Sequence, residues 1–432
     1  MFTRAITDRS IVPYPDTPPD PGPAGNIITD PFCENRIVRA TDQNTAYGHS
    51  FSGNSSAESN PWSADSTMFL CTEREAGGSR LCQFDPDTLS VTYLGMKRWP
   101  SGFAPFSFGY QDPNLLWGFQ DLTLKALNIS TGQVKILIDL RTVPQLGIPA
   151  SPRWFLHSLD GDYSDRRVCC CLGEGQDKSY LLIVYDLDQG LSWLNTQTGQ
   201  FFGFGSMQGQ APNWAPYKLH DCRSALTGSM IRSGGAGLPV QDTRVFWKPG
   251  TNAYDVVKPS ATIPMHGHVS MGFTTHFGGI LTTVPFQFIS LPIWKWEAYS
   301  QLMNPVPEPI QGFWSDYYLS ILPDFNDNGP LFISTVNIQG NPTVPGKPPT
   351  SICAADNEIF ALSTDGSGNW FRLAHHYSTG QKSGTFYSIP VLSVSPDGRF
   401  VLFTSDWQMM TGGTYPNQRS DAYVLETGYS RG

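Results

Sequence analysis

The stretch Ser63-Ala64-Asp65-Ser66-Thr67-Met68-Phe69-Leu70-Cys71-Thr72 returns near the end of the chain as Ser395-Pro396-Asp397-Gly398-Arg399-Phe400-Val401-Leu402-Phe403-Thr404. The two stretches share Ser, Asp, Leu and Thr at the same offsets. Each is typical of a strand end, a tight turn containing Asp and an apolar second strand. A looser third copy, Ser158-Leu159-Asp160-Gly161, precedes the apolar run 168–172. Repetition at this spacing predicts a fold built from several copies of one β unit.

A second turn motif marks a later hairpin in each unit. It occurs as Asp85-Pro86-Asp87-Thr88, Asn128-Ile129-Ser130-Thr131-Gly132, Asn195-Thr196-Gln197-Thr198-Gly199 and Ser363-Thr364-Asp365-Gly366. Two hairpins per unit give four antiparallel strands, which is a propeller blade. The units fall near residues 61–95, 103–140, 153–204, 217–262, 266–312, 315–374 and 389–428.

The two ends of the chain predict how the ring closes. The last unit contains strands at 400–404 and 422–425 and then stops without a fourth strand, whereas 36–41 is a strand with no unit of its own. A ring that completes its last blade with an N-terminal strand hides both edges. The sequence therefore predicts an all-β, seven-bladed β-propeller closed by an N-terminal strand in the last blade. Residues 1–28 are predicted as an extended, Pro-rich arm and 29–432 as one propeller domain.

Composition narrows the classes of partner. The chain has 28 basic and 37 acidic residues, a net charge of −9, and 42 Gly and 35 Pro residues. An acidic surface disfavours nucleic acid and anionic membranes, and no stretch has the ~18 apolar residues of a membrane span.

The N-terminus has no apolar signal-peptide core, yet two Asn-glycosylation sequons favour an extracellular location. Cys71 and Cys82 flank a turn symmetrically, so a hairpin is predicted to place them opposite each other on one face. They are interpreted either as a cross-strand disulfide or as two buried free thiols.

Histidines gather where inner strands begin or where loops enter the next blade. His49, His157, His220, His268 and His376 hold such places, and His266 and His375 lie beside two of them. Functional groups of propellers collect at these positions, so the set predicts a site rather than scattered histidines. No standard hydrolase, zinc-protease or dinucleotide motif is present.

The closing stretches of the chain resemble a known family. Asn369-Trp370-Phe371-Arg372-Leu373-Ala374-His375-His376-Tyr377-Ser378 and the stretch from Pro390 to Trp407 look like the last blades of propeller-type polysaccharide lyases, the oligogalacturonate lyases and related rhamnose-glucuronate lyases. The segments 37–42 and 60–63 are similar to that group as well. The resemblance implies cleavage of a uronate-containing glycan, with glucuronate or galacturonate, by β-elimination.

The resemblance leaves the metal open. Oligogalacturonate lyases carry metal-binding histidines just before the final inner strand, where this chain has Ser388-Ile389-Pro390-Val391. Ile389 and Val391 cannot ligate a cation, although His268 is similar in position to another metal ligand of the family. We therefore predict no certain cofactor, with Ca²⁺ or Mn²⁺ as the alternative and the ligands unknown.

β-Elimination requires a base for the C5 proton, an acid for the leaving oxygen and a positive group on the carboxylate. His157 and His220 are the predicted base and acid, Tyr217 is a reserve acid, and Arg98 or Arg153 is the predicted carboxylate clamp. Substrate contacts are predicted for His49, His268, His376, Trp62, Trp99, Trp154 and Trp214.

These residues support an enzyme acting on an acidic polysaccharide or oligosaccharide, from the chain end, as a monomer. The alternative is a non-catalytic propeller that binds carbohydrate or a protein, and a calcium-dependent hydrolase ranks third. Ultraviolet absorbance of an unsaturated product distinguishes the lyase from the binding propeller and from the hydrolase.

Overall fold

The computed structural model describes the following residues: 2–3, 6–8, 10–13, 17–53, 59–96, 99–148, 155–173, 179–195, 201–203, 222–225, 228–233, 243–247, 254–257, 270–271, 275–279, 293–297, 303–305, 316–322, 329–336, 354–365, 367, 369–379, 388–414 and 417–431. For 155, 157–159, 179–180, 195, 201–202, the strands between 222 and 317, 413–414 and 417–418, the backbone alone is described.

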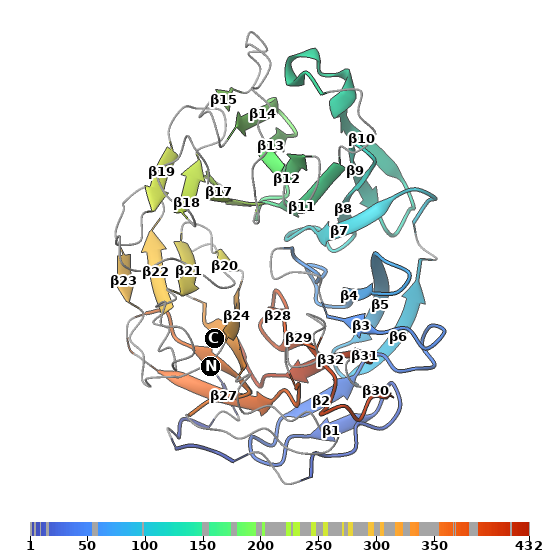
Figure 1. The fold of residues 1–432 in the computed structure, drawn as a ribbon, viewed down its shortest axis with the longest axis vertical. Coiled ribbons are helices and arrows are strands. Elements are labelled where there is room, and N and C mark those ends of the chain that lie inside the picture. The colour runs from blue at the N-terminus through green and yellow to red at the C-terminus, as the bar shows by residue number, and fades with distance from the viewer. Residues whose placement is uncertain are drawn as a thin grey trace.

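Within these residues, seven antiparallel sheets of four or five strands follow one another along the chain (Figure 1). Blade one is β3 (Phe51–Ser52), β4 (Met68–Glu73), β5 (Ser79–Asp85) and β6 (Ser90–Gly95), and blade two is β7 (Ala104–Phe108), β8 (Leu115–Gln120), β9 (Thr123–Asn128) and β10 (Val134–Asp139). Blade three is β11 (Phe155–Gly161), β12 (Arg167–Gly173), β13 (Ser179–Asp186), β14 (Gly190–Asn195) and β15 (Phe201–Phe202).

Blade four is β16 (Cys222–Ala225), β17 (Gly228–Ser233), β18 (Thr243–Trp247) and β19 (Tyr254–Val257), and blade five is β20 (Ser270–Met271), β21 (Thr275–Gly279), β22 (Ile293–Glu297) and β23 (Met303–Pro305). Blade six is β24 (Asp316–Ile321), β25 (Leu331–Val336), β26 (Glu358–Leu362) and β27 (Trp370–His375). Blade seven is β28 (Leu392–Val394), β29 (Phe400–Ser405), β32 (Asp421–Glu426), β2 (Arg36–Arg39) and β1 (Ile27–Thr29). The short strands β30 (Gly413–Thr414) and β31 (Asn417–Gln418) form a ribbon, and η1 (Leu140–Thr142) and η2 (Pro144–Leu146) are single 3-10 turns.

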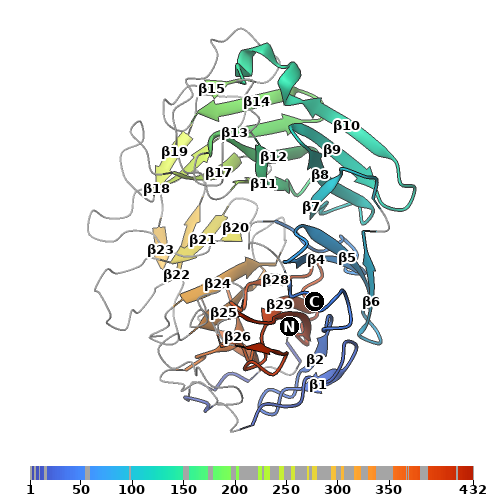
Figure 2. The same cartoon turned by 45° about the vertical axis from the view of Figure 1, so that its right-hand side comes forward.

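The N-terminal strand completes the last blade, as the sequence predicts. β2 pairs with β32 in the register Ile37↔Leu425 and Val38↔Val424, and Figure 2 shows the blue N-terminal strands beside the red C-terminal ones. β1 pairs with β2 and adds an outer fifth strand that the sequence analysis did not assign. The predicted all-β propeller with an N-terminal strand in its last blade is confirmed.

Hydrophobic packing lies between neighbouring blades. One buried cluster joins blade seven to blade one through Val38, Phe51, Trp62, Phe400 and Val424, among others. Each sheet has alternating side chains on both faces, so a blade buries apolar residues against its neighbours on either side. Strand β3 consequently contacts β29 and β32 of blade seven.

The repeated Ser-x-Asp turns have the same hydrogen bonds in blades one and seven. Ser63 Oγ donates to Asp65 Oδ1 at 2.7 Å, and Ser395 Oγ donates to Asp397 Oδ1 at 2.5 Å. The third residue after each Ser, Ser66 or Gly398, has a positive φ of 61° or 78°. The sequence repeat is therefore a structural repeat.

In blade three the equivalent turn lies four residues later than the sequence repeat suggested. Asp160 is inside β11, and Asp162 takes the place of the Ser: its N–H donates to Arg167 O at 3.0 Å. Blade one also differs from its predicted start at 60–63. Its inner strand begins at Phe51–Ser52 and resumes at the bridge between Trp62 and Phe69.

The N-terminal arm packs against the last two blades rather than standing apart from the propeller. Phe2 forms a bridge with Tyr429, and Ile6 forms one with Arg372. The carbonyl of Pro19 accepts a 2.7 Å hydrogen bond from Trp407 Nε1. No helix among the described residues has the length and hydropathy to cross a bilayer.

Candidate functional site

The described part of the chain contains five of the predicted site residues, one of them by its backbone alone. His49, Trp62, Trp99 and His376 are described with side chains, and His157 lies on the inner strand β11 as a backbone position. Arg98, Arg153, Trp154, Trp214, Tyr217, His220 and His268 lie outside the described residues. Their predicted roles stay predictions.

His49 lies in the connection from β2 to β3, two residues before the innermost strand of blade one. Its Nδ1 pairs with Glu73 Oε1, and the other oxygen of Glu73 accepts a 2.5 Å hydrogen bond from Arg80 Nε. The Glu73 side chain is 6% exposed and that of His49 is 27% exposed. We call His49, Glu73 and Arg80 the His49 cluster. In this cluster the imidazole of His49 is partly exposed to solvent, and its Nδ1 is paired with a carboxylate that forms a buried ion pair with Arg80.

Residues of blade seven support the backbone of His49. Arg419 Nε donates to the His49 carbonyl at 3.3 Å, and Arg419 also pairs with Asp421. Asp421 accepts a second guanidinium, that of Arg39, at 2.6 Å. Burial, with the charge of Arg39 next to it, lowers the pKa of Arg419 to about 10, so the guanidinium stays charged at neutral pH. Two arginines therefore share one carboxylate beside His49.

A second polar cluster is buried between blade six and the N-terminal arm. Arg372 forms an ion pair with Glu358, with Nε to Oε2 at 2.7 Å, and both side chains are at most 1% exposed. Asp30 accepts from His375 N at 2.9 Å and from Tyr377 Oη at 3.0 Å. Burial would lower the pKa of His375, but its hydrogen bond to Asp30 and the charges of Asp30 and Glu358 raise it. The cluster joins Asp30, just after β1, to blade six, and Arg372 Nη1 also donates to Ser10 O of the N-terminal arm at 2.9 Å.

Three predicted substrate contacts are buried in the structure. Trp62 is 0% exposed, lies in the core between blades one and seven, and donates to Ser393 O at 3.1 Å. His376 is also 0% exposed: Nε2 bonds to Thr335 O at 2.7 Å and Nδ1 accepts from Ser378 N at 2.9 Å. Trp99 is 8% exposed and packs in the core between blades one and two. None of these side chains presents a face to a ligand here, because apolar packing or backbone hydrogen bonds occupy it.

Sequence reasoning selected His49 but missed the residues that hold it. Glu73 and Arg80 stand at the ends of β4 and β5 and are both buried, at 4% and 7% exposure. A charged residue at the end of an apolar strand is usually solvated, so the sequence offered no signal that these two face each other.

The described residues supply no set of ligands for a metal. None of their histidines, cysteines and carboxylates form a group of three or more that could hold an ion. At the place where the sequence resemblance puts metal-binding histidines, Ile389 and Val391 pack in an apolar cluster with Tyr318 and Val336. In this part of the chain the residues do not fit the metal site of that family.

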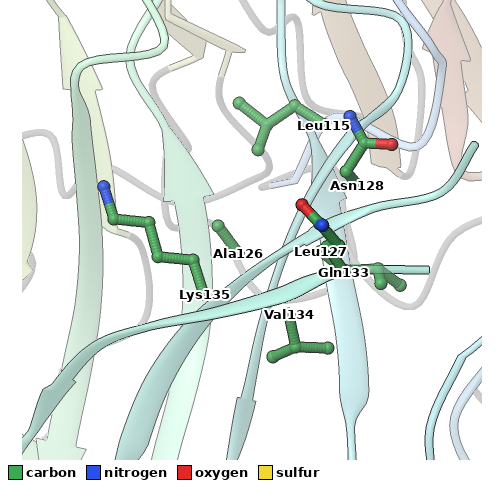
Figure 3. A pocket seen from close by; sticks show the side chains of 7 residues that line it. All are labelled: Leu115, Ala126, Leu127, Asn128, Gln133, Val134 and Lys135. Carbon is green, nitrogen blue, oxygen red and sulfur yellow. The ribbon is translucent and has the colours of Figure 1, made fainter. Parts of the chain in front are cut away.

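A hollow of about 460 Å³ lies on blade two, and no residue of the His49 cluster lines it (Figure 3). It is lined by Leu115, Ala126, Leu127, Asn128, Gln133, Val134 and Lys135 from β8, β9, β10 and the turn between the last two. These are outer strands of the blade, and Lys135 is the one charged side chain among the seven. The hollow lacks the paired proton-transfer groups that a catalytic site needs.

Comparison with known proteins gives likenesses of fold. No protein-family model matches the chain, and no curated protein sequence matches it. An oligogalacturonate lyase solved in complex with manganese has a TM-score of 0.59 and 12% identity, over 94% of this chain and 98% of that one. An oligogalacturonate lyase from Vibrio parahaemolyticus has a TM-score of 0.57 and 12% identity, over 93% and 98%. The β-propeller domain of the Trilobed protease from Pyrococcus furiosus has a TM-score of 0.42 and 6% identity, over 84% of this chain and 92% of that one. The chain thus has a β-propeller fold like that of two oligogalacturonate lyases.

Proposed function

We propose that this chain is a polysaccharide lyase that cleaves a uronate-containing glycan by β-elimination. The observation that carries the proposal is the extent of the likeness in fold, which spans 94% of this chain and 98% of an oligogalacturonate lyase. The motif resemblance of the last blades supports the same reaction. The substrate proposed is a glucuronate- or galacturonate-containing chain, cut from its end.

The reaction moves one proton away from the sugar ring and one toward it. A base removes the C5 proton, the electron pair of that C–H bond forms the C4=C5 double bond, and the C4–O bond breaks with its electrons on oxygen. An acid then protonates that oxygen. From the sequence we propose His157 and His220 for these two roles, with Tyr217 as a reserve acid and Arg98 or Arg153 as the clamp on the carboxylate.

A divalent cation is proposed as an alternative way to neutralise the carboxylate. The oligogalacturonate lyase neighbour is a manganese complex. A cation bound to a uronate carboxylate would acidify C5, which is the chemistry that an arginine clamp otherwise supplies. Since the described residues do not fit such a site, any ligands would include residues outside them, such as His268.

The test is the ultraviolet absorbance of digests of pectic, plant-gum and glucuronate-rich polysaccharides, with and without EDTA. We expect absorbance to rise as the unsaturated uronate forms, and mass spectrometry of the earliest products to show short oligosaccharides if cleavage is terminal. Loss of the signal in EDTA, restored by Mn²⁺ or Ca²⁺, would assign a metal. Flat absorbance with released reducing sugar would mean hydrolysis, and flat absorbance with no product from any substrate would favour a non-catalytic binding propeller.

We further propose a monomeric protein that acts outside the cell on an acidic glycan. The sequons at Asn54 and Asn128 and the covered strand edges of the last blade support this. Sedimentation of the purified protein and its recovery from culture medium test the two points separately.

A further inference from the structure

The His49 cluster has the arrangement of a positioned proton-transfer group. A carboxylate can only accept hydrogen bonds, so Nδ1 of His49 carries the proton in its pair with Glu73. The lone pair of the neutral ring is then on Nε2. Nε2 makes no hydrogen bond within the described residues, and the side chain is 27% exposed, so this nitrogen is the one open to a ligand.

The carboxylate that orients His49 is itself fixed. Glu73 is buried, and Arg80 holds its second oxygen at 2.5 Å. A buried carboxylate between an imidazole and a guanidinium has no freedom to turn away, and it stabilises the imidazolium that forms when Nε2 takes a proton. The backbone of His49 is held as well, because its carbonyl accepts from Arg419 and its N–H donates to Ala46 O at 2.8 Å.

An exposed aromatic ring stands beside this imidazole. Tyr47 is 96% exposed, the highest value among the exposed large hydrophobic residues, and its ring centroid is 6.1 Å from that of His49. Tyr47 also has a φ of 50°, in the left-handed region that residues with a side chain rarely adopt. A left-handed backbone conformation and a fully exposed aromatic ring both raise the free energy of the unliganded protein. Sugar rings pack on exposed aromatic faces, so a bound sugar would cover this ring.

We infer that His49, positioned by Glu73 and Arg80, is the base that removes the C5 proton of a uronate residue, and that Tyr47 carries the sugar ring beside it. This rests on the proposed lyase activity and deepens it. It gives the role of base to His49 in place of His157 or His220 and leaves the acid to one of those two or to Tyr217. The location suits this role, because His49 lies in the loop that enters the innermost strand of blade one, and functional groups of propellers collect at such positions. This strand also packs against blade seven.

In the step itself, the C5–H bond breaks and a new N–H bond forms at Nε2 of His49. The carbon electron pair becomes the C4=C5 double bond, the C4–O bond breaks, and the leaving oxygen takes a proton from the acid. His49 ends as an imidazolium paired with Glu73, and it returns its proton to water before the next turnover. No oxidant or further reactant is required.

The test compares kcat and KM of the full chain, on the substrate found with the wild-type protein, for His49→Gln, His49→Ala, Glu73→Gln and Tyr47→Ala. Matched controls are Asp188→Asn, a 62% exposed carboxylate that pairs with Arg166 in blade three, and Ile136→Ala, a 64% exposed side chain on β10. Circular dichroism and the melting temperature establish that each variant is folded.

We expect His49→Gln to lower kcat about 100-fold or more with a small change in KM. Added imidazole should restore part of the rate of His49→Ala, which a merely structural histidine would not allow. Glu73→Gln should lower kcat at least about 10-fold. Tyr47→Ala should raise KM, and both controls should behave as the wild type.

A folded His49→Gln variant with the kcat of the wild type overturns the inference while the lyase activity stands. A wild-type protein that gives no unsaturated product overturns the proposed function instead. Calorimetry with an oligouronate then tests whether the residues around His49 bind the sugar. Unchanged binding in Tyr47→Ala and His49→Gln would remove the binding role as well. Weaker binding in Tyr47→Ala would keep a sugar-binding surface and exclude the proton transfer.

Discussion

Two neighbouring histidines show how far the role of a residue depends on its surroundings. His375 faces the carboxylates of Asp30 and Glu358, whereas His376 is 0% exposed and its ring nitrogens bond to backbone atoms. Burial, outweighing the hydrogen bond to Thr335, lowers the pKa of His376 to about 3, whereas the pKa of His375 is raised. The two residues therefore respond to pH in opposite directions.

The sign of the His376 effect gives a prediction for stability. Below the ordinary histidine pKa of about 6.5, the unfolded chain binds a proton at this position and the native chain does not. The free energy of unfolding should therefore fall as the pH drops from about 6.5 toward 3, by up to about 1.4 kcal/mol per pH unit from this residue. Urea unfolding of wild type and His376→Gln across this range should show a shallower slope in the variant.

His375→Gln is the matched control, because a raised native pKa stabilises the fold below the ordinary pKa and loses its contribution as the pH rises. Removing this side chain should therefore cost more stability in acid than at alkaline pH. Identical pH slopes in wild type and His376→Gln would contradict the assignment of a neutral, buried His376.

At the scale of elements, the β4–β5 hairpin shows what register decides. The sequence suggested that Cys71 and Cys82 lie directly opposite each other, but Cys71 pairs with Arg80 and Cys82 pairs with Phe69. The two cysteines are diagonal neighbours on one buried face, with sulfur atoms 3.7 Å apart, and both are free thiols. Of the two interpretations that the sequence left open, the structure has the buried thiols.

We predict that these two thiols stay reduced and unreactive in the native protein. The hydrogen bond with Cys71, burial and the charge of Cys71 all raise the pKa of Cys82, so little thiolate is available to react. Alkylation in native buffer, followed by peptide mass spectrometry, should leave both residues unmodified, and alkylation in denaturant should modify both. A linked peptide containing Cys71 and Cys82 in the unreduced sample would show that the disulfide forms after all.

At the scale of the whole molecule, β2 connects the first residues of the chain to the last. Its residues Ile37 and Val38 are 0% exposed and belong to two different core clusters, one toward blade six and one toward blade one. Pairing with β32 also covers an edge that would otherwise be open to another chain. The ring is therefore held at this blade by residues nearly 400 positions apart, for example Ile37 and Leu425.

Replacing Ile37 with Ala should lower the free energy of unfolding by about 2–5 kcal/mol, because it opens a cavity in the closing blade. Ile27→Ala on the outer strand β1, where the side chain is 42% exposed, should stay within about 0.5 kcal/mol of wild type. Denaturant melts of the two variants provide the comparison. Equal losses for Ile37 and Ile27 would mean that β2 does not close the ring in solution.

Much of the architecture follows from local features of the sequence. Alternating apolar strands and Ser-x-Asp turns predicted the all-β propeller and its seven blades, because strands and turns depend on a few consecutive residues. The β2–β32 pairing was predicted because the last unit lacks a fourth strand and the N-terminal strand has no unit of its own. The predicted position of a turn was wrong where the sequence contains two similar turn motifs close together. The sequence analysis assigned the later hairpin turn of blade three to 195–199. In the structure the turn between β13 and β14 begins at Asp186, whose side chain accepts from Asp188 N and Gln189 N, and β14 extends to Asn195.

What the sequence by itself determined is therefore the fold class, the number of blades, the closing strand and the histidines worth testing. Only the tertiary structure decided that His376 and Trp62 are buried. It also decided that, of the histidines whose side chains it describes, His49 pairs with a buried carboxylate and is partly exposed to solvent. The reason is separation along the chain: His49 and Glu73 are 24 residues apart and Asp30 and His375 are 345 apart. Such pairs leave no periodic pattern. The β3–β4 pairing, with Phe51 opposite Glu73, brings the first pair together, and packing of the segment after β1 on blade six brings the second together.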